Sequence, residues 1–358
     1  MGNSRLERLL SQLPEEVDAV LVASGVGRRY LTGMQSSAGT LLAFRDGSAY
    51  FVIDSRYIEA ARAAVRGCEV LLQEKLYAQL GGLLERHGAK RVAVEGDYMT
   101  LSEHLDFKER LPGVELLADR RLSGLLRRMR AVKSPEEVAA VRAAQAITDA
   151  AYSHILGYIR PGRTEREIAG ELLDFCYRRG SERPAFDFIV VSGKNSSKPH
   201  GVPSDKPVEA GDFVTMDFGC VVDGYCSDMT RTVAVGCVSD EQRRVYETVL
   251  AAQRAALAAA RPGIRGKEVD AAAREVIAAA GWGDCFGHGT GHSLGLEIHE
   301  PPAFSPTEEE LLEPGMIITV EPGIYLEGRF GVRIEDMVLL TEDGSLDLTD
   351  SDKEITVL

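Results

Sequence analysis

The sequence predicts a mixed α/β protein with two domains, and the second domain is predicted to contain an internal repeat. The chain has 358 residues, which is too many for one typical domain. Helical and strand-like stretches alternate over the first third of the chain. Beyond residue 134, two segments follow the same order of motifs, which indicates two similar halves.

Apolar runs and turn signals predict the first domain, which we place at residues 1–125. Thr40–Phe44 and Ala49–Ile53 flank the turn Arg45–Ser48, and this is the pattern of a β-hairpin. Other elements are predicted as helices over Leu6–Leu13, Ser55–Ala64 and Leu76–Arg86 and as strands over Ala19–Val22, Val70–Leu72 and Arg91–Val94.

The second domain, residues 134–358, begins at a helix-start signal. Ser134 is a capping residue, Pro135 suits the first helical position, and Glu137 completes a capping box. We expect an Ala-rich helix from here to about Ile159. A connecting helix is predicted over Leu122–Val132.

The repeat within this domain predicts a shared site. Arg160-Pro161-Gly162 recurs as Arg261-Pro262-Gly263, and Glu209–Asp217 resembles Glu313–Glu321. Each half is therefore expected to run helix, helix and β-hairpin. Two halves that face each other across a pseudo-twofold axis would each supply two carboxylates to one site.

Composition and charge narrow the class of protein. A net charge of −14 argues against nucleic acid as a partner. The acidic excess lies in residues 134–358, which suits metal cations and free ammonium groups, although a solubilising surface explains it nearly as well. The charged start Met1–Arg8 and the lack of a long apolar run predict no signal peptide and no membrane span. Six cysteines without a C-x-x-C pair indicate reduced thiols in a cytoplasmic protein.

Four carboxylates in two predicted hairpins indicate a metal site. Asp217 and Asp228 lie on either side of the Asp223-Gly224 turn, so the two like charges should be close. Glu321 and Glu335 flank the turn at 327–329 in the same way. Apolar residues surround all four acids, and buried acids of like charge need a cation. We therefore favour a metal site over structural ion pairs.

Histidines cluster between the two hairpins. His288, His292 and His299 fall within residues 287–300, and His200 lies in a loop-like segment. Gly291–Gly295 matches a G-x-S-x-G nucleophile motif. His299 follows its serine too closely to complete a triad, so a serine hydrolase is disfavoured.

These motifs resemble those of the pita-bread metallopeptidases, family M24, and among them the Xaa-Pro aminopeptidases and prolidases. The segments that carry the resemblance are Met216–Gly219, Asp223–Thr232, His288–Glu300, Val320–Gly323 and Gly331–Asp336. Arg29–Gly33 and Asp54–Tyr57 resemble parts of the family's creatinase-like N-terminal domain. The resemblance implies that fold, followed by a pita-bread catalytic domain with a pseudo-twofold repeat.

The resemblance also implies the metal ligands and the residue roles. Two divalent ions would be held by Asp217, Asp228, His292, Glu321 and Glu335, with Asp228 and Glu335 bridging. Such a set suits Mn²⁺, with Co²⁺, Zn²⁺ or Fe²⁺ as substitutes. The catalytic residues implied are Glu321 as proton shuttle and His200 and His299 at the scissile bond. Thr230, Arg333, His288 and Tyr225 are implied to support the ligands or to line the substrate pocket.

The implied substrates are peptides with proline at position 2. Dipeptidase-type relatives often carry an Arg where this chain has Ala303, which favours an Xaa-Pro aminopeptidase over a dipeptidase (prolidase). Less favoured alternatives are a methionine aminopeptidase, a metal-free creatinase-like hydrolase and an inactive binding module of the same fold. The resemblance also implies a homodimer.

Overall fold

The chain divides into two units in a computed structural model that describes residues 4–358. The division falls between Arg130 and Ala131, inside the interval between the predicted domains at 1–125 and 134–358. Each unit has its own sheets and its own buried core.

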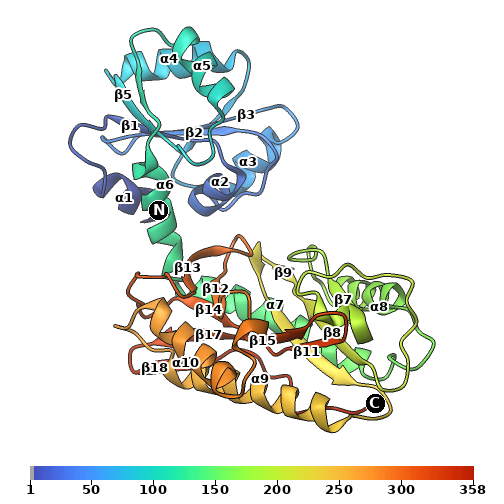
Figure 1. The fold of residues 1–358 in the computed structure, drawn as a ribbon. Helices are drawn as coiled ribbons and strands as arrows, with labels where there is room; N and C mark the ends of the chain where they lie inside the picture. Colours follow the sequence, from blue (N-terminus) through green and yellow to red (C-terminus); the bar gives the residue numbers. More distant parts are fainter. Residues whose placement is uncertain (1–3) are drawn as a thin grey trace. The chain divides into compact units, whose positions relative to one another are not determined.

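A six-stranded mixed sheet forms the centre of the first unit, in the order β4-β3-β2-β1-β5-β6. Its strands are β1 (Ala19–Val22), β2 (Thr40–Phe44), β3 (Ala49–Ile53), β4 (Glu69–Leu72), β5 (Arg91–Val94) and β6 (Glu115–Leu117). The helices are α1 (Ser4–Ser11), α2 (Gly25–Thr32), α3 (Ile58–Ala64), α4 (Leu76–Arg86), α5 (Leu101–Arg110) and α6 (Arg120–Ala131). Figure 1 shows them on both sides of the sheet.

The predicted elements of this unit are all present. The hairpin is confirmed, with Thr40 opposite Val52 in the β2–β3 ladder. The helix predicted from Ser55 begins only at Ile58, because the Asp54 side chain accepts from the Arg56 amide at 3.0 Å and holds a turn there. Helices α2 and α5 and strand β6 were not predicted. Leu101 leaves 76% of its surface exposed, so α5 lacks a clear apolar stripe.

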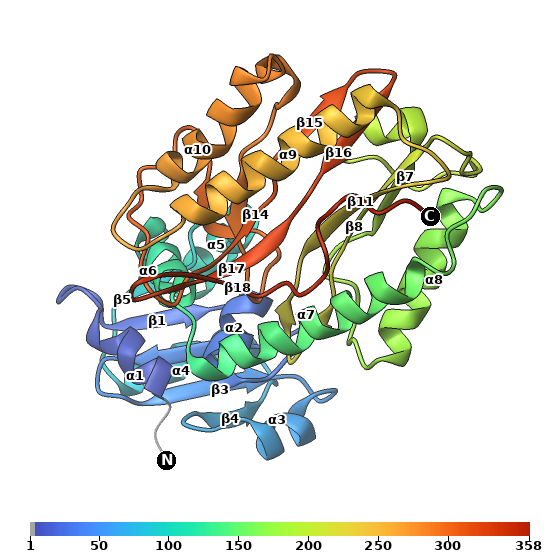
Figure 2. The same ribbon diagram turned by 90° about the horizontal axis from the view of Figure 1, so that it is seen from below.

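The second unit contains the expected repeat of two helices and a hairpin. The first half has α7 (Pro135–Ile155), α8 (Glu165–Arg178), β8 (Phe213–Phe218) and β11 (Met229–Ala234). The second half has α9 (Asp240–Ala259), α10 (Gly266–Ala279), β14 (Ile317–Val320) and β17 (Asp336–Thr341). α7 begins with the predicted capping box and ends before the predicted Ile159, at a turn that contains Gly157. Figure 2 shows α7 and α9 running alongside the strands of the two halves.

Shorter strands complete the second unit. They are β7 (Ile189–Ser192), β9 (Val221–Val222), β10 (Tyr225–Cys226), β12 (Gly291–Ser293), β13 (Glu300–Phe304), β15 (Gly323–Leu326), β16 (Phe330–Arg333) and β18 (Gly344–Asp347). Two turns of 3₁₀ helix lie at Gly193–Ser197 and Gly283–Cys285. The larger sheets have the orders β11-β8-β7 and β13-β12-β14-β17-β18. Apolar side chains of α9 and α10 pack against the second of these, while α7 and α8 cover the first.

All six cysteines lie within the described residues and are free thiols. No helix in the described part of the chain has both the length and the apolar character needed to cross a membrane.

Candidate metal centre and substrate cavity

The two hairpins bring the four predicted carboxylates together. Asp217 lies on β8 opposite Thr230, so Asp228 stands just before β11 and diagonal to it. In the second half, Val320 pairs with Asp336, which places Glu321 and Glu335 next to that pair. Asp228 and Glu335 are buried, whereas Asp217 and Glu321 are half-buried at the edge of a cavity.

His292 completes the cluster from β12. This strand pairs with β14 through Ser293 and Ile318, and the carbonyl of Thr319 would lie 1.9 Å from a Cβ at position 291. Only glycine therefore permits this approach. The His292 Nε2 atom lies 3.5 Å from an Asp228 oxygen and 3.4 Å from Glu321 Oε1.

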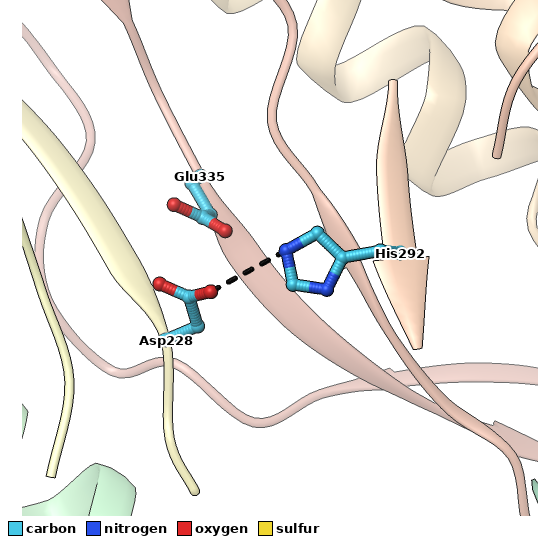
Figure 3. Close-up of side chains that lie close together, drawn as sticks. All are labelled: Asp228, His292 and Glu335. Carbon is cyan, nitrogen blue, oxygen red and sulfur yellow. Dashed lines mark ion pairs between the residues drawn. The ribbon is translucent and has the colours of Figure 1, made fainter. Parts of the chain in front are cut away.

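The imidazole of His292 is oriented for metal binding. Its Nδ1 lies 3.1 Å from the carbonyl oxygen of Ser293, so Nδ1 carries the proton and donates it. Burial lowers the pKa of His292, which keeps the ring neutral. Nε2 therefore presents a lone pair to the carboxylates. Figure 3 shows Asp228, His292 and Glu335 pointing toward one another. One possible ligand atom from each of these residues lies within 4.8 Å of those of the other two.

The electrostatics of the cluster fit a cation. Burial, followed by the charge of Glu335, raises the pKa of Asp228 well above its ordinary value. Burial and the charge of Glu321 do the same for Glu335, and burial also raises the pKa of Glu321. One buried oxygen each of Asp217 and Asp228 has no hydrogen-bond partner. Buried acids with orphan oxygens are what a divalent ion would satisfy, so the donor set fits the implied metals.

Arg333 and Thr230 form hydrogen bonds with two of the carboxylates. The Arg333 guanidinium pairs with Asp217, and its Nε donates to the Thr230 hydroxyl at 3.0 Å. That hydroxyl in turn donates to Glu335 Oε2 at 2.6 Å. Arg333 of the second half thus contacts a carboxylate of the first half, and Thr230 of the first half contacts a carboxylate of the second half.

His288 lies on the wall of the cavity and contacts Tyr325. Its Nε2 is 2.9 Å from the Tyr325 hydroxyl, which also accepts from Arg333 at 2.9 Å. Its Nδ1 donates to the carbonyl of Gly289 at 2.8 Å. Since Nδ1 is protonated, Nε2 accepts from Tyr325. Burial lowers the pKa of His288 and raises the pKa of Tyr325 to about 12, so both groups are neutral at pH 7.

The four carboxylates line a cavity of about 690 Å³. His200 and His299 stand on its wall, and the His299 ring packs against His292 with 4.4 Å between ring centres. An apolar surface adjoins them, formed by Phe186, Phe188, Ile189, Val202, Pro203 and Ile298. Arg333 is the sole Arg or Lys among the cavity-lining residues that the structure describes, and Ala303 also lies there.

Tyr225 is the predicted pocket residue that the structure places elsewhere. Its side chain is buried and its hydroxyl donates to Glu137 on α7 at 2.6 Å. Tyr225 sits in the short β9–β10 ladder at the hairpin tip, which turns it toward this helix. It does not line the described cavity.

Two buried acids near the site were not predicted. Glu165 accepts from Ser192, Asn195 and Ser204, and so holds the loop that carries His200. Glu165 is the first residue of α8, and its partners lie at the end of β7 and in the segment that follows this strand. No periodic pattern in the sequence connects these separate segments.

Asp270 has the corresponding role beside the second hairpin. It accepts from the amide and hydroxyl of Thr290, whose carbonyl receives the Glu321 amide at 2.7 Å. Tyr325 was also missed, although it lies only four residues after Glu321. Its position on β15, facing His288, depends on the pairing of β15 with β16.

Two facing half-domains that share one acidic cavity have the architecture of the pita-bread metallohydrolases. Residues 139–342 match the sequence model of Metallopeptidase family M24, and residues 5–132 match that of the Creatinase/Prolidase N-terminal domain. The chain belongs to metallopeptidase family M24. The predicted family, the fold class and the prediction of an enzyme are thereby confirmed.

Relatives match over nearly the full length of the chain. It is 42% identical over 359 residues to the Bacillus subtilis protein named Uncharacterized peptidase YqhT, with 100% of each covered. A solved structure named Xaa-Pro dipeptidase from Bacillus anthracis has a TM-score of 0.95 and 40% identity, with 99% of each chain covered. One named X-Pro aminopeptidase from Thermotoga maritima has a TM-score of 0.90 and 36% identity, also with 99% of each covered.

Proposed function

We propose that this protein is a metal-dependent exopeptidase that hydrolyses the Xaa-Pro bond at the N-terminus of peptides. The observation that carries the proposal is the convergence of four carboxylates and a neutral imidazole on the wall of one cavity. The proposed ligands of two divalent ions are Asp217, Asp228, His292, Glu321 and Glu335. An oxygen-rich set with one imidazole favours Mn²⁺. When bound, the ions would supply an activated water and polarise the scissile carbonyl.

Glu321 is the proposed proton carrier. It is half-buried beside His292, and burial raises the pKa of its carboxyl group, which favours transient protonation. The nitrogen of a Xaa-Pro bond carries no hydrogen, so it must receive a proton as it leaves. Glu321 would take the proton from the attacking water and pass it to this nitrogen.

His299 and His200 are proposed to bind the substrate around the scissile carbonyl. Both lie on the cavity wall. Burial lowers the pKa of His299, so at neutral pH it is an uncharged ring with one N–H to donate. Such a donor stabilises negative charge that develops on the carbonyl oxygen. The apolar surface around Phe188 and Ile189 is suited to the proline ring.

The substrate is proposed to be a peptide longer than two residues. A dipeptide would place its C-terminal carboxylate inside the cavity, close to four acidic groups. Ala303 supplies no charge there, and Arg333 is already bonded to Asp217, Thr230 and Tyr325. The second candidate is an Xaa-Pro dipeptidase, which the name of the Bacillus anthracis structure favours.

Metal-dependent hydrolysis of three peptides tests the proposal. Apo-protein would be assayed with Ala-Pro-Ala, Ala-Pro and Ala-Ala-Ala, with and without Mn²⁺, beside Glu321→Gln. The proposal predicts Mn²⁺-dependent release of alanine from Ala-Pro-Ala, with a loss of about 10²–10⁴-fold in the variant. Faster cleavage of Ala-Pro would favour the dipeptidase, and equal cleavage of Ala-Ala-Ala would contradict the requirement for proline.

The proposal also covers the cellular location, the partners and the oligomeric state of the enzyme. Six free cysteines favour a reducing compartment, which supports a cytoplasmic location. A net charge of −14 makes nucleic acid an unfavourable partner. A homodimer is proposed from the family resemblance, and light scattering on the purified protein would measure its mass.

A further inference from the structure

A second fully buried arginine joins the two halves of the metallopeptidase unit on the side away from the cavity. Successive side chains of a strand point to opposite faces. Thr230 of β11 points to Glu335, so its neighbour Arg231 points the other way. Arg231 is completely buried, and it is absent from the cavity lining.

Arg231 binds the backbone beneath the proposed ligands. Its Nη1 donates to the carbonyl of Thr230 at 3.0 Å and to that of Glu335 at 2.5 Å. The Glu335 amide also donates to the Thr230 carbonyl at 3.1 Å. Arg231 belongs to the first half and Glu335 to the second, so this contact fixes one half against the other.

Asp336 and the C-terminal segment hold the other side of the guanidinium group. Nη2 donates to Asp336 Oδ1 at 2.6 Å and to the carbonyl of Ser351 at 2.8 Å, and Nε donates to the carbonyl of Asp352 at 2.9 Å. With the bonds to the carbonyls of Thr230 and Glu335, the planar guanidinium group of Arg231 donates five hydrogen bonds. A lysine with three donors on a single nitrogen cannot make this set.

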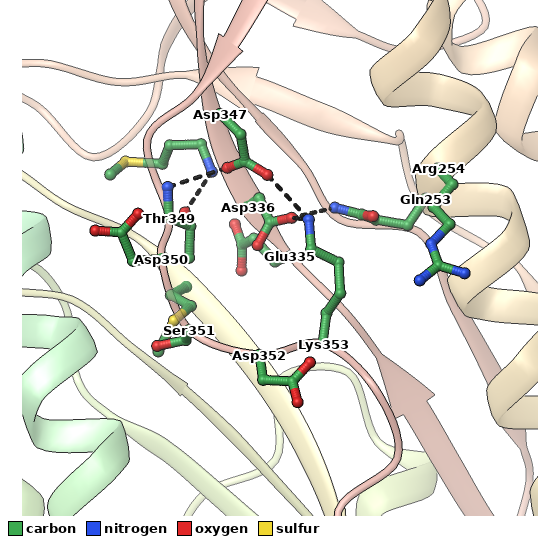
Figure 4. A network of polar contacts seen from close by, with 12 residues as sticks. Gln253, Arg254, Glu335, Asp336, Asp347, Thr349, Asp350, Ser351, Asp352 and Lys353 are labelled. Carbon is green, nitrogen blue, oxygen red and sulfur yellow. Dashed lines mark hydrogen bonds and ion pairs between the residues drawn. The ribbon is translucent and has the colours of Figure 1, made fainter.

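Asp336 is itself held from two further directions. Gln253 of α9 donates to its Oδ2 at 2.6 Å, and Lys353 pairs with the same oxygen (Figure 4). Lys353 also reaches Asp347 at 2.9 Å. Asp336 follows the proposed ligand Glu335 directly, so these contacts fix the start of β17.

The C-terminal segment then continues along the first hairpin. The Ala234 amide at the end of β11 donates to Thr356 at 2.9 Å, and the Leu358 amide donates back to Ala234 at 2.9 Å. Residues 351–358 therefore run from the second half to the strand that carries Arg231. The same segment both binds Arg231 and extends its sheet.

We propose that Arg231 is a positioning residue for the metal centre, and that residues 351–353 of the C-terminal segment hold it in place. By binding the carbonyls of Thr230 and Glu335 at once, Arg231 sets the separation of the carboxylates that the two halves contribute. An ion pair that served stability alone would need only Asp336. The inference rests on the proposed metal site and adds to it a residue that touches neither metal nor substrate.

Mn²⁺ affinity of folded variants tests this inference. Apo wild type, Arg231→Lys and Lys353→Met would be titrated by calorimetry at a temperature where circular dichroism shows each to be fully folded. Loss of a group that orients metal ligands typically weakens binding by about 10–100-fold. We expect a loss in that range for Arg231→Lys and a smaller loss of severalfold for Lys353→Met.

Two control variants separate positioning from general destabilisation. Arg254→Met removes an exposed ion pair with Glu354 in the same C-terminal segment without touching Asp336. Ile277→Val loosens the core of the same unit at a buried residue of α10 that does not line the cavity. Both are expected to bind Mn²⁺ as wild type does.

Wild-type Mn²⁺ affinity in folded Arg231→Lys would overturn the inference. Should Arg231→Lys not fold, Lys353→Met decides, since wild-type affinity there also overturns it and a severalfold loss supports it. A wild-type protein that binds no Mn²⁺ would instead overturn the proposed function on which the inference rests.

Discussion

Replacing Asp228 by Asn is expected to stabilise the metal-free protein, although it removes a proposed ligand. Asp228 and Glu335 are buried, and their ligand atoms lie within 4.8 Å of each other. Two unit charges at that distance repel by about 3.5 kcal/mol at an effective dielectric constant of 20. Proton uptake and the burial of a new amide offset part of this gain. A net stabilisation on the order of 2 kcal/mol remains.

The sign of the effect follows from the raised pKa values of the buried acids. An acid whose pKa is raised in the folded state does not lower the free energy of unfolding at a pH below its unfolded-state pKa, because it is protonated in both states. As the pH rises above the unfolded-state pKa, the carboxyl group ionises readily in the unfolded chain but stays protonated in the folded protein. The free energy of unfolding therefore falls. Asp228→Asn avoids this loss, so its advantage grows from about pH 4 upward.

Thermal unfolding of chelator-treated protein at pH 5 and pH 8 measures the effect. For a unit of this size, 2 kcal/mol corresponds to about 4–8 °C in melting temperature. We expect that increase at pH 8 and a smaller one at pH 5. Asp174→Asn, which removes an exposed ion pair with Arg178, is the matched control and should change little. An apo variant that is no more stable than wild type at pH 8 would refute the electrostatic argument.

Three further substitutions test separate parts of the site. Thr230→Val removes the 2.6 Å hydrogen bond to Glu335 and should weaken Mn²⁺ binding by about 10–100-fold in calorimetry; unchanged affinity would contradict this role. His299→Ala should lower kcat for Ala-Pro-Ala by about 10²–10³-fold with metal content unchanged, and a change in KM alone would argue against transition-state stabilisation. Ala303→Arg places a cation beside the cavity, so it should raise the ratio of kcat/KM for Ala-Pro to kcat/KM for Ala-Pro-Ala by about tenfold. An unchanged ratio would show that the C-terminal carboxylate of the dipeptide binds elsewhere.

Local sequence patterns predicted the carboxylate cluster because the two acids of each hairpin are close to one another in the sequence. A turn at Asp223-Gly224 fixes the register of β8 and β11, and the register alone brings Asp217 close to Asp228. The repeat then predicted that a second pair would meet the first. Missed elements such as α5 have apolar residues on their exposed face, where periodicity gives no signal.

Side chains that act across the two halves were harder to predict. Arg231 and Tyr325 have partners about 105 and 37 positions away in sequence, and each pairing depends on the final packing of separate sheets. Tyr225 was expected to support the ligands or to line the pocket because of its place in the Asp223–Thr232 motif, whereas the short β9–β10 ladder directs its hydroxyl to Glu137 of α7. Contacts set by tertiary packing have no local signature.

Initial rates of Ala-Pro-Ala hydrolysis during a Mn²⁺ titration of apo-protein test whether this chain is a two-metal Xaa-Pro peptidase. We expect no activity without metal and a rate that rises as two ions bind per chain, with both binding and rate lost in Glu335→Gln. Full activity in the chelated protein, or two bound ions without any hydrolysis of this peptide, would contradict it.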